Sequence, residues 1–167
     1  MPTLRFSLAP CALGFVLVAR SDAGVCQVAL GDDETALETG LRADFPGATI
    51  ERDDAGLTGE VEAVLASLRG ESDYPDLALD VCATDFQLRV WRALQGIPRG
   101  ETLSYSELAA RVGNANAVRA VASACARNPV ALVFPCHRVV GKNGSLAGFR
   151  WQIERKRKLL AGERGNG

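Results

Sequence analysis

The chain has 167 residues, of which 47% are hydrophobic and 23% are charged, a balance typical of a globular protein that excludes long disorder, a collagen-like repeat and a coiled coil. The net charge of −1 hides an asymmetry, because residues 1–80 carry 5 Arg and Lys against 15 Asp and Glu, whereas residues 81–167 carry 14 against 5. We therefore expect two domains, residues 1–80 and residues 81–167, of which the second binds a polyanion.

The N-terminal segment predicts β-strands. Residues 6–19 faintly resemble a secretory signal, but Pro10 and Gly14 interrupt the segment, and we interpret it as a pair of strands. Its apolar run, residues 11–19, is too short to span a bilayer, so we expect no membrane partner. The β-rich runs over residues 13–19 and 25–30 predict a hairpin.

The rest of residues 1–80 predicts a small α/β unit without a recognisable catalytic motif. The expected elements are a helix over 34–45 begun by Asp32 or Asp33, a short strand over 48–52, a helix around 61–68 with Thr58 as its N-cap and Gly70 at its end, and a short strand over 77–81. The many acidic residues of this half are interpreted as a solvated face.

Residues 84–127 predict three helices, of which the last two form a helix-turn-helix pattern. Thr84 is expected to cap a helix that ends before the loop at residues 96–100. Ser104 and Glu107 form a capping box, which predicts a second helix that Gly113 ends. A short turn then leads to a third helix over residues 117–127.

The third helix is rich in small residues. Small side chains let a helix approach another surface closely, and tight packing against a neighbouring helix explains this pattern as well as a binding surface does. Arg119 lies near the start of the helix, where a cation is unfavourable for the helix dipole, so it needs another partner. We expect a phosphate or an opened base stack to be that partner. The small residues are Ala117, Ala120, Ala122, Ser123, Ala124 and Ala126.

A cysteine and the single histidine of the chain follow an apolar run. Residues 129–134 predict a buried strand that ends at Pro135, and Cys136 and His137 come directly after it. A thiol becomes a nucleophile as the thiolate, so it needs a base or a positive field. Neighbouring side chains on a strand point to opposite faces, so a working pair needs a turn or a water between them. The alternative is a core cysteine beside a surface histidine. A basic helix is expected over residues 152–160.

The cysteine pattern argues against a metal site. The chain has five cysteines, no Cys-x-x-Cys pair and one histidine, so a zinc site would need four scattered thiolates. We expect no metal and no cofactor. Free thiols fit a reducing compartment, and we expect a cytoplasmic protein.

Residues 80–163 resemble the catalytic domain of the O6-alkylguanine-DNA alkyltransferases. The motifs that carry the resemblance are TDFQ at 84–87, VW at 90–91, IPRGET at 97–102, SY at 104–105, AVRAV at 117–121, RNP at 127–129, VFPCHRVV at 133–140, GFRW at 148–151 and RK at 155–156. Residues 1–80 are similar to the smaller domain of that family. The resemblance implies an α/β (α+β) chain, with a three-stranded ribonuclease-H-like domain before a mainly helical domain that holds the helix-turn-helix.

The resemblance also implies roles for single residues. Cys136 matches the alkyl acceptor, His137 the residue that takes the thiol proton through a water, and Glu163 the group that orients this histidine. Asn128 matches the asparagine that orders the active-site turn, and Tyr105 the tyrosine that meets the extruded base. The residues expected to bind the substrate or the DNA are Arg119, which enters the base stack, Lys156 in the active-site wall, Phe149, Arg150, Ala117, Ala120, Ser123 and Arg138.

The implied function is direct reversal of DNA damage. An alkyl group, chiefly methyl, moves from O6 of guanine, and also from O4 of thymine, to Cys136 in one irreversible turnover after the base has been flipped out. The expected partner is double-stranded DNA containing O6-alkylguanine. A monomer of the protein contacts the minor groove of this DNA and is associated with the nucleoid when bound.

Three other functions are weighed against this one. They are a non-catalytic lesion-binding protein of the alkyltransferase-like type, a helix-turn-helix transcription factor and a cysteine hydrolase with multiple turnovers.

The sequence also departs from the family pattern. Phe149 stands where a tyrosine is common, and Arg150 stands where other members carry a small residue. We expect these two residues to narrow the pocket toward methyl groups.

Overall fold

The computed structural model describes residues 3–146 and 148–165. Contacts between residues divide the chain into two compact units. The first contains residues 1–71, 75–81 and 129–133, and the second contains residues 72–74, 82–128 and 134–167. No helix within the described residues has both the length and the apolar character needed to cross a membrane.

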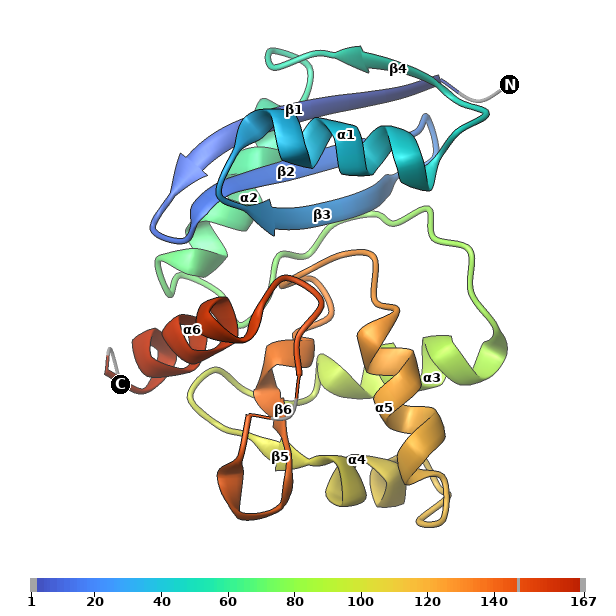
Figure 1. Cartoon of the computed structure of the whole chain (residues 1–167), viewed down its shortest axis with the longest axis vertical. Helices are drawn as coiled ribbons and strands as arrows, with labels where there is room; N and C mark the ends of the chain where they lie inside the picture. Colours follow the sequence, from blue (N-terminus) through green and yellow to red (C-terminus); the bar gives the residue numbers. More distant parts are fainter. Residues whose placement is uncertain (1–2, 147, 166–167) are drawn as a thin grey trace. The chain divides into compact units, whose positions relative to one another are not determined.

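A four-stranded sheet forms the centre of the first unit (Figure 1). Its strands are β1 (Thr3–Cys11), β2 (Gly14–Arg20), β3 (Val25–Gly31) and β4 (Thr49–Arg52), in the order β3-β2-β1-β4. The first three strands are antiparallel neighbours, and β4 runs parallel to β1. The strand pair predicted over residues 6–19 and the strand predicted over 25–30 are confirmed. The resemblance implied three strands, and the short β4 adds a fourth.

Two helices cover the faces of this sheet. α1 (Glu34–Asp44) lies in front of the sheet in Figure 1 and packs on β2 and β3, whereas α2 (Thr58–Leu68) lies behind it and packs on β1. Because both faces are covered, successive residues of β2 are fully buried, among them Val16, Leu17 and Val18. The result is an uninterrupted apolar strand rather than an alternating one.

The ends of some elements in this unit differ from the sequence-based expectation. Asp33 is the N-cap of α1, as predicted, and its carboxylate accepts hydrogen bonds from two backbone N–H groups of the first turn. The predicted N-cap Thr58 is wrong, because Leu57 occupies that position and the Thr58 hydroxyl donates to carbonyls of the preceding turn. The strand predicted over 77–81 is also wrong, since it is reduced to a single bridge between Leu79 and Val25.

The second unit is mainly helical. Its helices are α3 (Asp85–Leu94), α4 (Tyr105–Arg111), α5 (Val118–Ala126) and α6 (Ile153–Gly165). The capping box predicted at Ser104 and Glu107 is present at the start of α4, and the predicted cap Thr84 begins α3, where it forms a second capping box with Gln87. Gly113, with a φ of 89°, ends the turn after α4, so α4 and α5 are the two helices of the expected helix-turn-helix pattern.

A short parallel ladder fixes part of this unit. β5 (Leu103–Ser104) pairs with β6 (Val139–Val140), so Leu103 lies opposite Val139 and Ser104 lies opposite Val140. β5 directly precedes α4, and β6 directly follows the short 3₁₀ turn η1 (Cys136–Arg138). The ladder therefore joins the start of α4 to the end of that turn.

The core of the second unit is centred on Trp91 of α3. Its indole Nε1 donates a hydrogen bond of 2.8 Å to the carbonyl of Ala124 in α5, which satisfies the polar atom of a buried ring. The ring of Trp91 stacks on the ring of Phe134, with centroids 5.5 Å apart. Trp91 thus connects α3, α5 and the segment that leads into η1.

The strand predicted over residues 129–134 is wrong. Val130 forms an isolated bridge with Val28, residues 131–133 form a turn, and Leu132 has a φ of 71°. The burial of this apolar run was correctly expected, because Val130 and Ala131 are fully buried. A short apolar run reports burial but does not by itself distinguish a strand from a buried turn.

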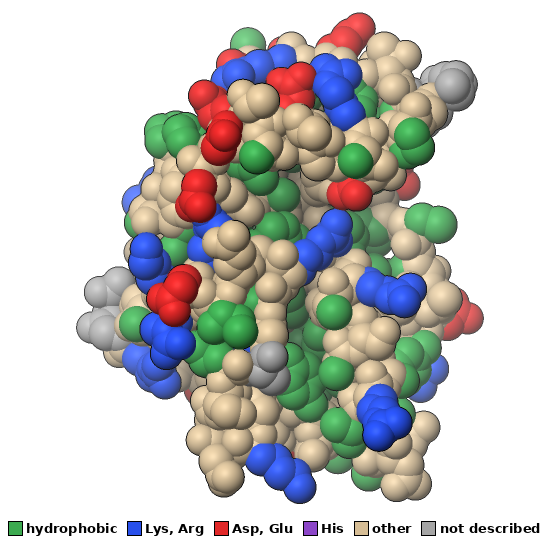
Figure 2. Space-filling view, in the orientation of Figure 1, with side chains coloured by type: hydrophobic (Ala, Val, Ile, Leu, Met, Phe, Trp, Pro, Cys, Tyr) green, Lys and Arg blue, Asp and Glu red, His purple; other side chains and the backbone are tan. Residues whose placement is uncertain are grey.

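The charge asymmetry of the sequence is visible on the surface. On the face seen in Figure 2, Asp and Glu side chains gather over the first unit, whereas the second unit shows mainly Lys and Arg. A basic surface of this kind attracts phosphate groups without regard to base sequence.

Candidate active site

The acceptor candidate lies in a buried turn of the second unit. Cys136, His137 and Arg138 form η1, and their exposed fractions are 6%, 1% and 1%. A 3₁₀ turn rotates successive side chains by about 120°, so Cys136 and His137 are not forced onto opposite faces as they would be on a strand. The turn that the sequence required for a working cysteine–histidine pair is present.

Asn128 organises this turn. Its side chain is fully buried, and its Nδ2 donates to the carbonyl of Phe134 at 2.7 Å and to Sγ of Cys136 at 3.3 Å. One amide group therefore holds both the backbone before the turn and the sulfur atom itself. This position agrees with the role that the resemblance implies for Asn128.

His137 is paired with Glu163 of α6. Nε2 of His137 lies 2.8 Å from Oε2 of Glu163. Burial alone would raise the pKa of Glu163, but its hydrogen bonds with His137 and Arg138 outweigh that effect and lower the pKa to about 2. Glu163 is then an ionised, acceptor-only group, so Nε2 carries the ring proton and donates it to the carboxylate.

The other ring nitrogen of His137 is free to act as a base. Nδ1 is buried and has no hydrogen-bond partner among the described residues. Burial lowers the pKa of His137, which keeps the ring neutral at pH 7. With the proton fixed on Nε2, the lone pair of this neutral imidazole is on Nδ1.

The thiol of Cys136 needs such a base. Burial raises its pKa, and the hydrogen bond from Asn128 and the charge of Lys156 only partly oppose this effect. The resting sulfur is therefore a protonated thiol. A general base is required to form the thiolate that acts as nucleophile.

Cys136 opens into a pocket of about 510 Å³. The wall consists of the start of α4, one side of α5 and the segment 148–150. The described lining residues are Tyr105, Val118, Arg119, Ala122, Cys125, Ala126, Cys136, Gly148, Phe149 and Arg150. The pocket is apolar apart from a few convergent polar groups, which is typical of a site for a small ring system.

Tyr105 and Lys156 form one end of the site. Nζ of Lys156 donates to the carbonyl of Gly148 at 3.0 Å and lies 5.9 Å from the centre of the Tyr105 ring. Burial raises the pKa of Tyr105 to about 12, so its phenol stays protonated and can donate a hydrogen bond. Lys156 is fully buried, in agreement with an expected place in the active-site wall.

Phe149 and Arg150 close the pocket on the side of the segment 148–150. NH1 of Arg150 donates to the carbonyl of Asn128 at 2.9 Å, and its guanidinium lies over the ring of Trp151 at 5.5 Å. Phe149 packs edge-on to Trp151 and lies 6.5 Å from the ring of His137. Both departures from the family pattern therefore face the pocket.

The small residues of α5 divide between two faces. Ala124 and Cys125 are buried within the unit, which agrees with the packing interpretation of the pattern. Ala120 and Ser123 are exposed, and Ala117 is partly exposed at the N-cap, so a second face remains open to a ligand. The sequence alone did not separate these two faces.

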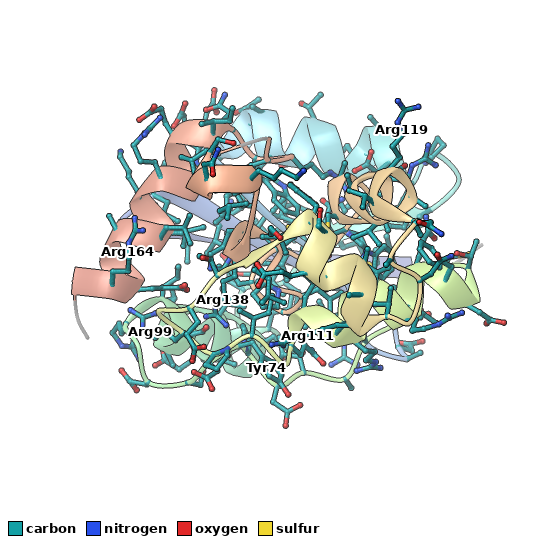
Figure 3. The ribbon with its side chains drawn as sticks, turned by 90° about the horizontal axis from the view of Figure 1, so that it is seen from below. Tyr74, Arg99, Arg111, Arg119, Arg138 and Arg164 are labelled. Atoms are coloured by element: carbon teal, nitrogen blue, oxygen red, sulfur yellow. The ribbon has the colours of Figure 1, made fainter. Side chains whose placement is uncertain are left out.

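Arg119 and Arg138 have opposite environments. Arg119 is exposed at the pocket rim and projects outward from α5, whereas Arg138 lies among the elements of the unit (Figure 3). The expectation that Arg138 contacts DNA is wrong for this conformation, because its guanidinium is buried and bonded to Glu163 and to two backbone carbonyls. An arginine with these partners is not available to a phosphate.

Sequence reasoning assigned no role to three residues near the site. Cys125 is a second thiol in the pocket wall, and its place among the small residues of α5 was the available signal. NH1 of Arg99 lies 3.9 Å from Glu163, and Asp73 contacts Arg99 and Arg138, which are long-range contacts that no local motif predicts. No group of three or more His, Cys, Asp or Glu residues in the described part of the chain is arranged to hold a metal ion.

The chain is similar to proteins of known function. Residues 85–165 match the family model "6-O-methylguanine DNA methyltransferase, DNA binding domain". The bifunctional transcriptional activator/DNA repair enzyme Ada of Escherichia coli is 47% identical over 163 residues, which are 98% of this chain and 46% of Ada. A methylated-DNA–protein-cysteine methyltransferase of Mycolicibacterium paratuberculosis is 50% identical over 106 residues, 64% of each chain. The chain thus spans about half to two thirds of the length of these relatives.

Solved structures resemble the whole chain. The O6-methylguanine methyltransferase of Mycobacterium tuberculosis superposes with a TM-score of 0.79 at 34% identity, covering 100% of this chain and 95% of that one. The structure of Mycobacterium tuberculosis OGT in complex with DNA gives a TM-score of 0.80 at 34% identity, covering 98% and 94%. The mixed α/β fold expected from the sequence is confirmed by these neighbours.

Proposed function

Since the chain belongs to the O6-methylguanine DNA methyltransferase family, we propose that it repairs DNA by transferring the methyl group from O6 of guanine to Sγ of its own Cys136. One observation carries this proposal. A buried thiol lines a pocket of about 510 Å³, and the neighbouring neutral His137 has an unengaged Nδ1 and a carboxylate partner. This is the arrangement of a nucleophile, a base and an orienting group.

The reaction begins with removal of the thiol proton. Sγ accepts a hydrogen bond from Asn128, and Nδ1 of His137 has no hydrogen-bond partner among the described residues, so we propose that a water carries the proton from Sγ to Nδ1. The negative charge of Glu163 stabilises the imidazolium that results. The water-mediated path follows the role that the family resemblance implies for His137.

The thiolate then attacks the methyl carbon. The S–C bond forms as the C–O6 bond breaks, and the electron pair of that bond passes to the guanine. The protonated phenol of Tyr105 is suited to donate a hydrogen bond to the guanine as negative charge develops on it. The product is a neutral thioether, which lacks a good leaving group for the reverse reaction, so each molecule acts once.

DNA is the proposed partner. The target atom is inside a duplex, and the base must be flipped into the pocket at a cost of a few kcal/mol. The exposed small residues of α5 allow close approach to the minor groove, and Arg119 at the pocket rim fills the place that the base leaves. We propose that residues 81–167 carry both DNA binding and alkyl acceptance, that a monomer suffices, and that O4-alkylthymine is a second substrate.

The other functions fit the site less well. A non-catalytic lesion-binding protein does not need an acceptor thiol, whereas this site combines Cys136 with His137, Asn128 and Glu163. A transcription factor would not need a pocket behind its recognition helix. A hydrolase would need a path for repeated release of the acyl group, and the thioether proposed here is not released.

Mass spectrometry tests the proposal directly. The protein is incubated with a duplex holding one O6-methylguanine and digested with trypsin. Cleavage at Arg127 and Arg138 separates Cys136, in residues 128–138, from Cys125 in the preceding peptide. We expect one methyl increment on residues 128–138, at no more than one per molecule. Tight lesion binding without an increment would instead indicate a non-catalytic lesion-binding protein.

A further inference from the structure

Arg138 occupies a fixed position beside Glu163. Its Nε donates to Oε1 of Glu163 at 3.0 Å, and its NH2 donates to Oε2 at 2.9 Å, which is a two-pronged contact with one carboxylate. NH1 donates to the carbonyl of Ile97 at 2.9 Å. A buried arginine stays charged, so the guanidinium of Arg138, with these hydrogen bonds, holds the carboxylate plane of Glu163 in one orientation.

The same carboxylate oxygen serves His137. Oε2 of Glu163 accepts from Nε2 of His137 at 2.8 Å and from NH2 of Arg138 at 2.9 Å. Because one oxygen is shared, the orientation of the imidazole ring depends on how Arg138 is held. The position of Arg138 therefore affects the proton-transfer site as well as the packing of the core.

Asp73 holds this arginine from a distant part of the sequence. The backbone carbonyl of Asp73 accepts from NH2 of Arg138 at 2.6 Å, although 65 residues separate the two positions. The side chain of Asp73 makes a second contact, because its Oδ1 accepts from the backbone N–H of Arg99 at 3.2 Å. NH1 of Arg99 in turn lies 3.9 Å from Oε2 of Glu163. Residues 72–74 belong to the same compact unit as the site.

We infer that the side chain of Asp73 is a positioning group for the alkyl-acceptor site. By accepting from the Arg99 N–H it fixes the segment whose backbone carbonyl anchors Arg138, and so it holds Glu163 and the ring of His137 in place. The inference rests on the proposed function for its kinetic consequence. Its chemistry is electrostatic orientation and involves no bond to the substrate. The ordinary alternative is a solvated loop aspartate whose side chain has no effect on the site.

Asp76 provides a matched control. It is an exposed aspartate three residues further along, and the described residues offer it no hydrogen bond or ion pair. Asp73→Ala removes the acceptor for the Arg99 N–H, whereas Asp73→Asn keeps an oxygen acceptor and removes only the charge. The three variants Asp73→Ala, Asp73→Asn and Asp76→Ala separate the contact from the charge.

The single histidine of the chain gives a direct readout of the ring. In ¹⁵N-labelled protein all imidazole signals belong to His137. We expect the wild type to show a protonated Nε2 and an unprotonated Nδ1. In Asp73→Ala the Nε2 proton is expected to exchange faster with solvent and its signal to shift. Asp73→Asn and Asp76→Ala are expected to keep the wild-type signals.

The rate of methyl transfer is measured on the same four proteins. Positioning of a general base contributes a large factor to a rate, and we expect Asp73→Ala to lower the single-turnover rate constant about tenfold at unchanged lesion affinity. Burial is the larger influence on the pKa of His137 and lowers it, whereas the contact with Glu163 raises it. Loosening that contact should therefore move the low-pH limb of the rate profile to lower pH.

The outcomes are distinguishable. If Asp73→Ala has the same histidine signals, transfer rate and pH profile as Asp76→Ala, the inference is overturned. A lower melting temperature with unchanged histidine signals and rate assigns Asp73 to the fold alone and overturns it as well. If the wild type transfers no methyl group, the proposed function fails, while the histidine signals still decide whether Asp73 orients the ring.

Discussion

Nε2 of His137 lies 2.8 Å from Oε2 of Glu163, a residue 26 positions later in the chain. The carboxylate keeps the ring proton on Nε2, so Nδ1 is the nitrogen that can accept a proton. Burial raises the pKa of Cys136 and lowers the pKa of His137, so both groups rest in their neutral forms. The thiolate of Cys136 and the imidazolium of His137 form only when the reaction proceeds, and Glu163 is already in place to stabilise the imidazolium.

Glu163→Gln is expected to lower the rate of methyl transfer by about 100-fold, because an amide no longer enforces the proton position on His137. The affinity for a duplex with O6-methylguanine should change little, since Glu163 is buried away from solvent. Single-turnover kinetics and equilibrium binding measure the two effects separately. A variant with the wild-type rate would show that His137 needs no carboxylate partner.

The stability of the protein should decrease in two stages as the pH falls. The folded-state pKa of His137 is lowered from its usual 6.5, so its contribution is present above pH 6.5 and is lost as the pH falls through the folded value. The pKa of Glu163 is lowered from 4.5 to about 2, so its contribution is lost between these two values. Thermal melting at successive pH values checks both stages, and Glu163→Gln should lack the second.

Cys136→Ser is expected to abolish methyl transfer and to retain lesion binding. The hydroxyl keeps the contact with Asn128, but at neutral pH a serine is a far weaker nucleophile than a thiolate. Mass spectrometry and gel-shift binding measure the two properties. Cys125→Ser is the control, because Cys125 lines the same pocket, and it should keep transfer. Residual methylation of Cys136→Ser would point to Cys125 as the acceptor.

Arg119→Ala is expected to impair transfer on a fully paired duplex more than on a single strand. The side chain is proposed to fill the base stack, and this contribution is needed only where the flipped base leaves a gap. The ratio of transfer rates on the two substrates measures the effect. Arg111→Ala, a change at an exposed arginine of α4 that does not line the pocket, serves as a control. Equal losses on both substrates would contradict the role of Arg119 in flipping.

Arg150→Gly is expected to widen the range of alkyl groups. Arg150 lines the pocket and is bonded to the carbonyl of Asn128, so its removal enlarges the opening near Cys136. The wild type should transfer methyl faster than benzyl from the corresponding O6-alkylguanines, and the variant should reduce this preference. Equal wild-type rates on the two substrates would mean that Phe149 and Arg150 do not narrow the pocket.

Local signals in the sequence predicted much of the fold. The capping residues of α3 and α4 are short-range hydrogen-bond patterns, and both were found where Thr84 and Ser104 predicted them. The strand predicted over residues 129–134 is wrong, because the run forms only one bridge, with Val28 about a hundred positions earlier in the chain, before it turns. The spacing of apolar residues along the sequence does not predict such a long-range contact.

The site was predicted in part for the same reason. Cys136 and His137 are neighbours in the sequence, and their chemistry was readable there. The role of Arg138 was misjudged, because its partners Glu163, Ile97 and Asp73 are 25, 41 and 65 positions away. A basic residue in a basic half of a chain suggests DNA contact until its buried partners are known.

The two-residue ladder between β5 and β6 has a consequence for how this site can change. Ser104 is the N-cap of the helix that begins at Tyr105, and Val139 follows the turn that contains Cys136. The backbone hydrogen bonds of the ladder therefore fix the start of that helix relative to that turn. Main-chain bonds do not depend on which side chains flank them. Side chains of the pocket wall, such as those at positions 149 and 150, can therefore be substituted to accept other alkyl groups. The distance between Sγ of Cys136 and the phenol of Tyr105 stays the same.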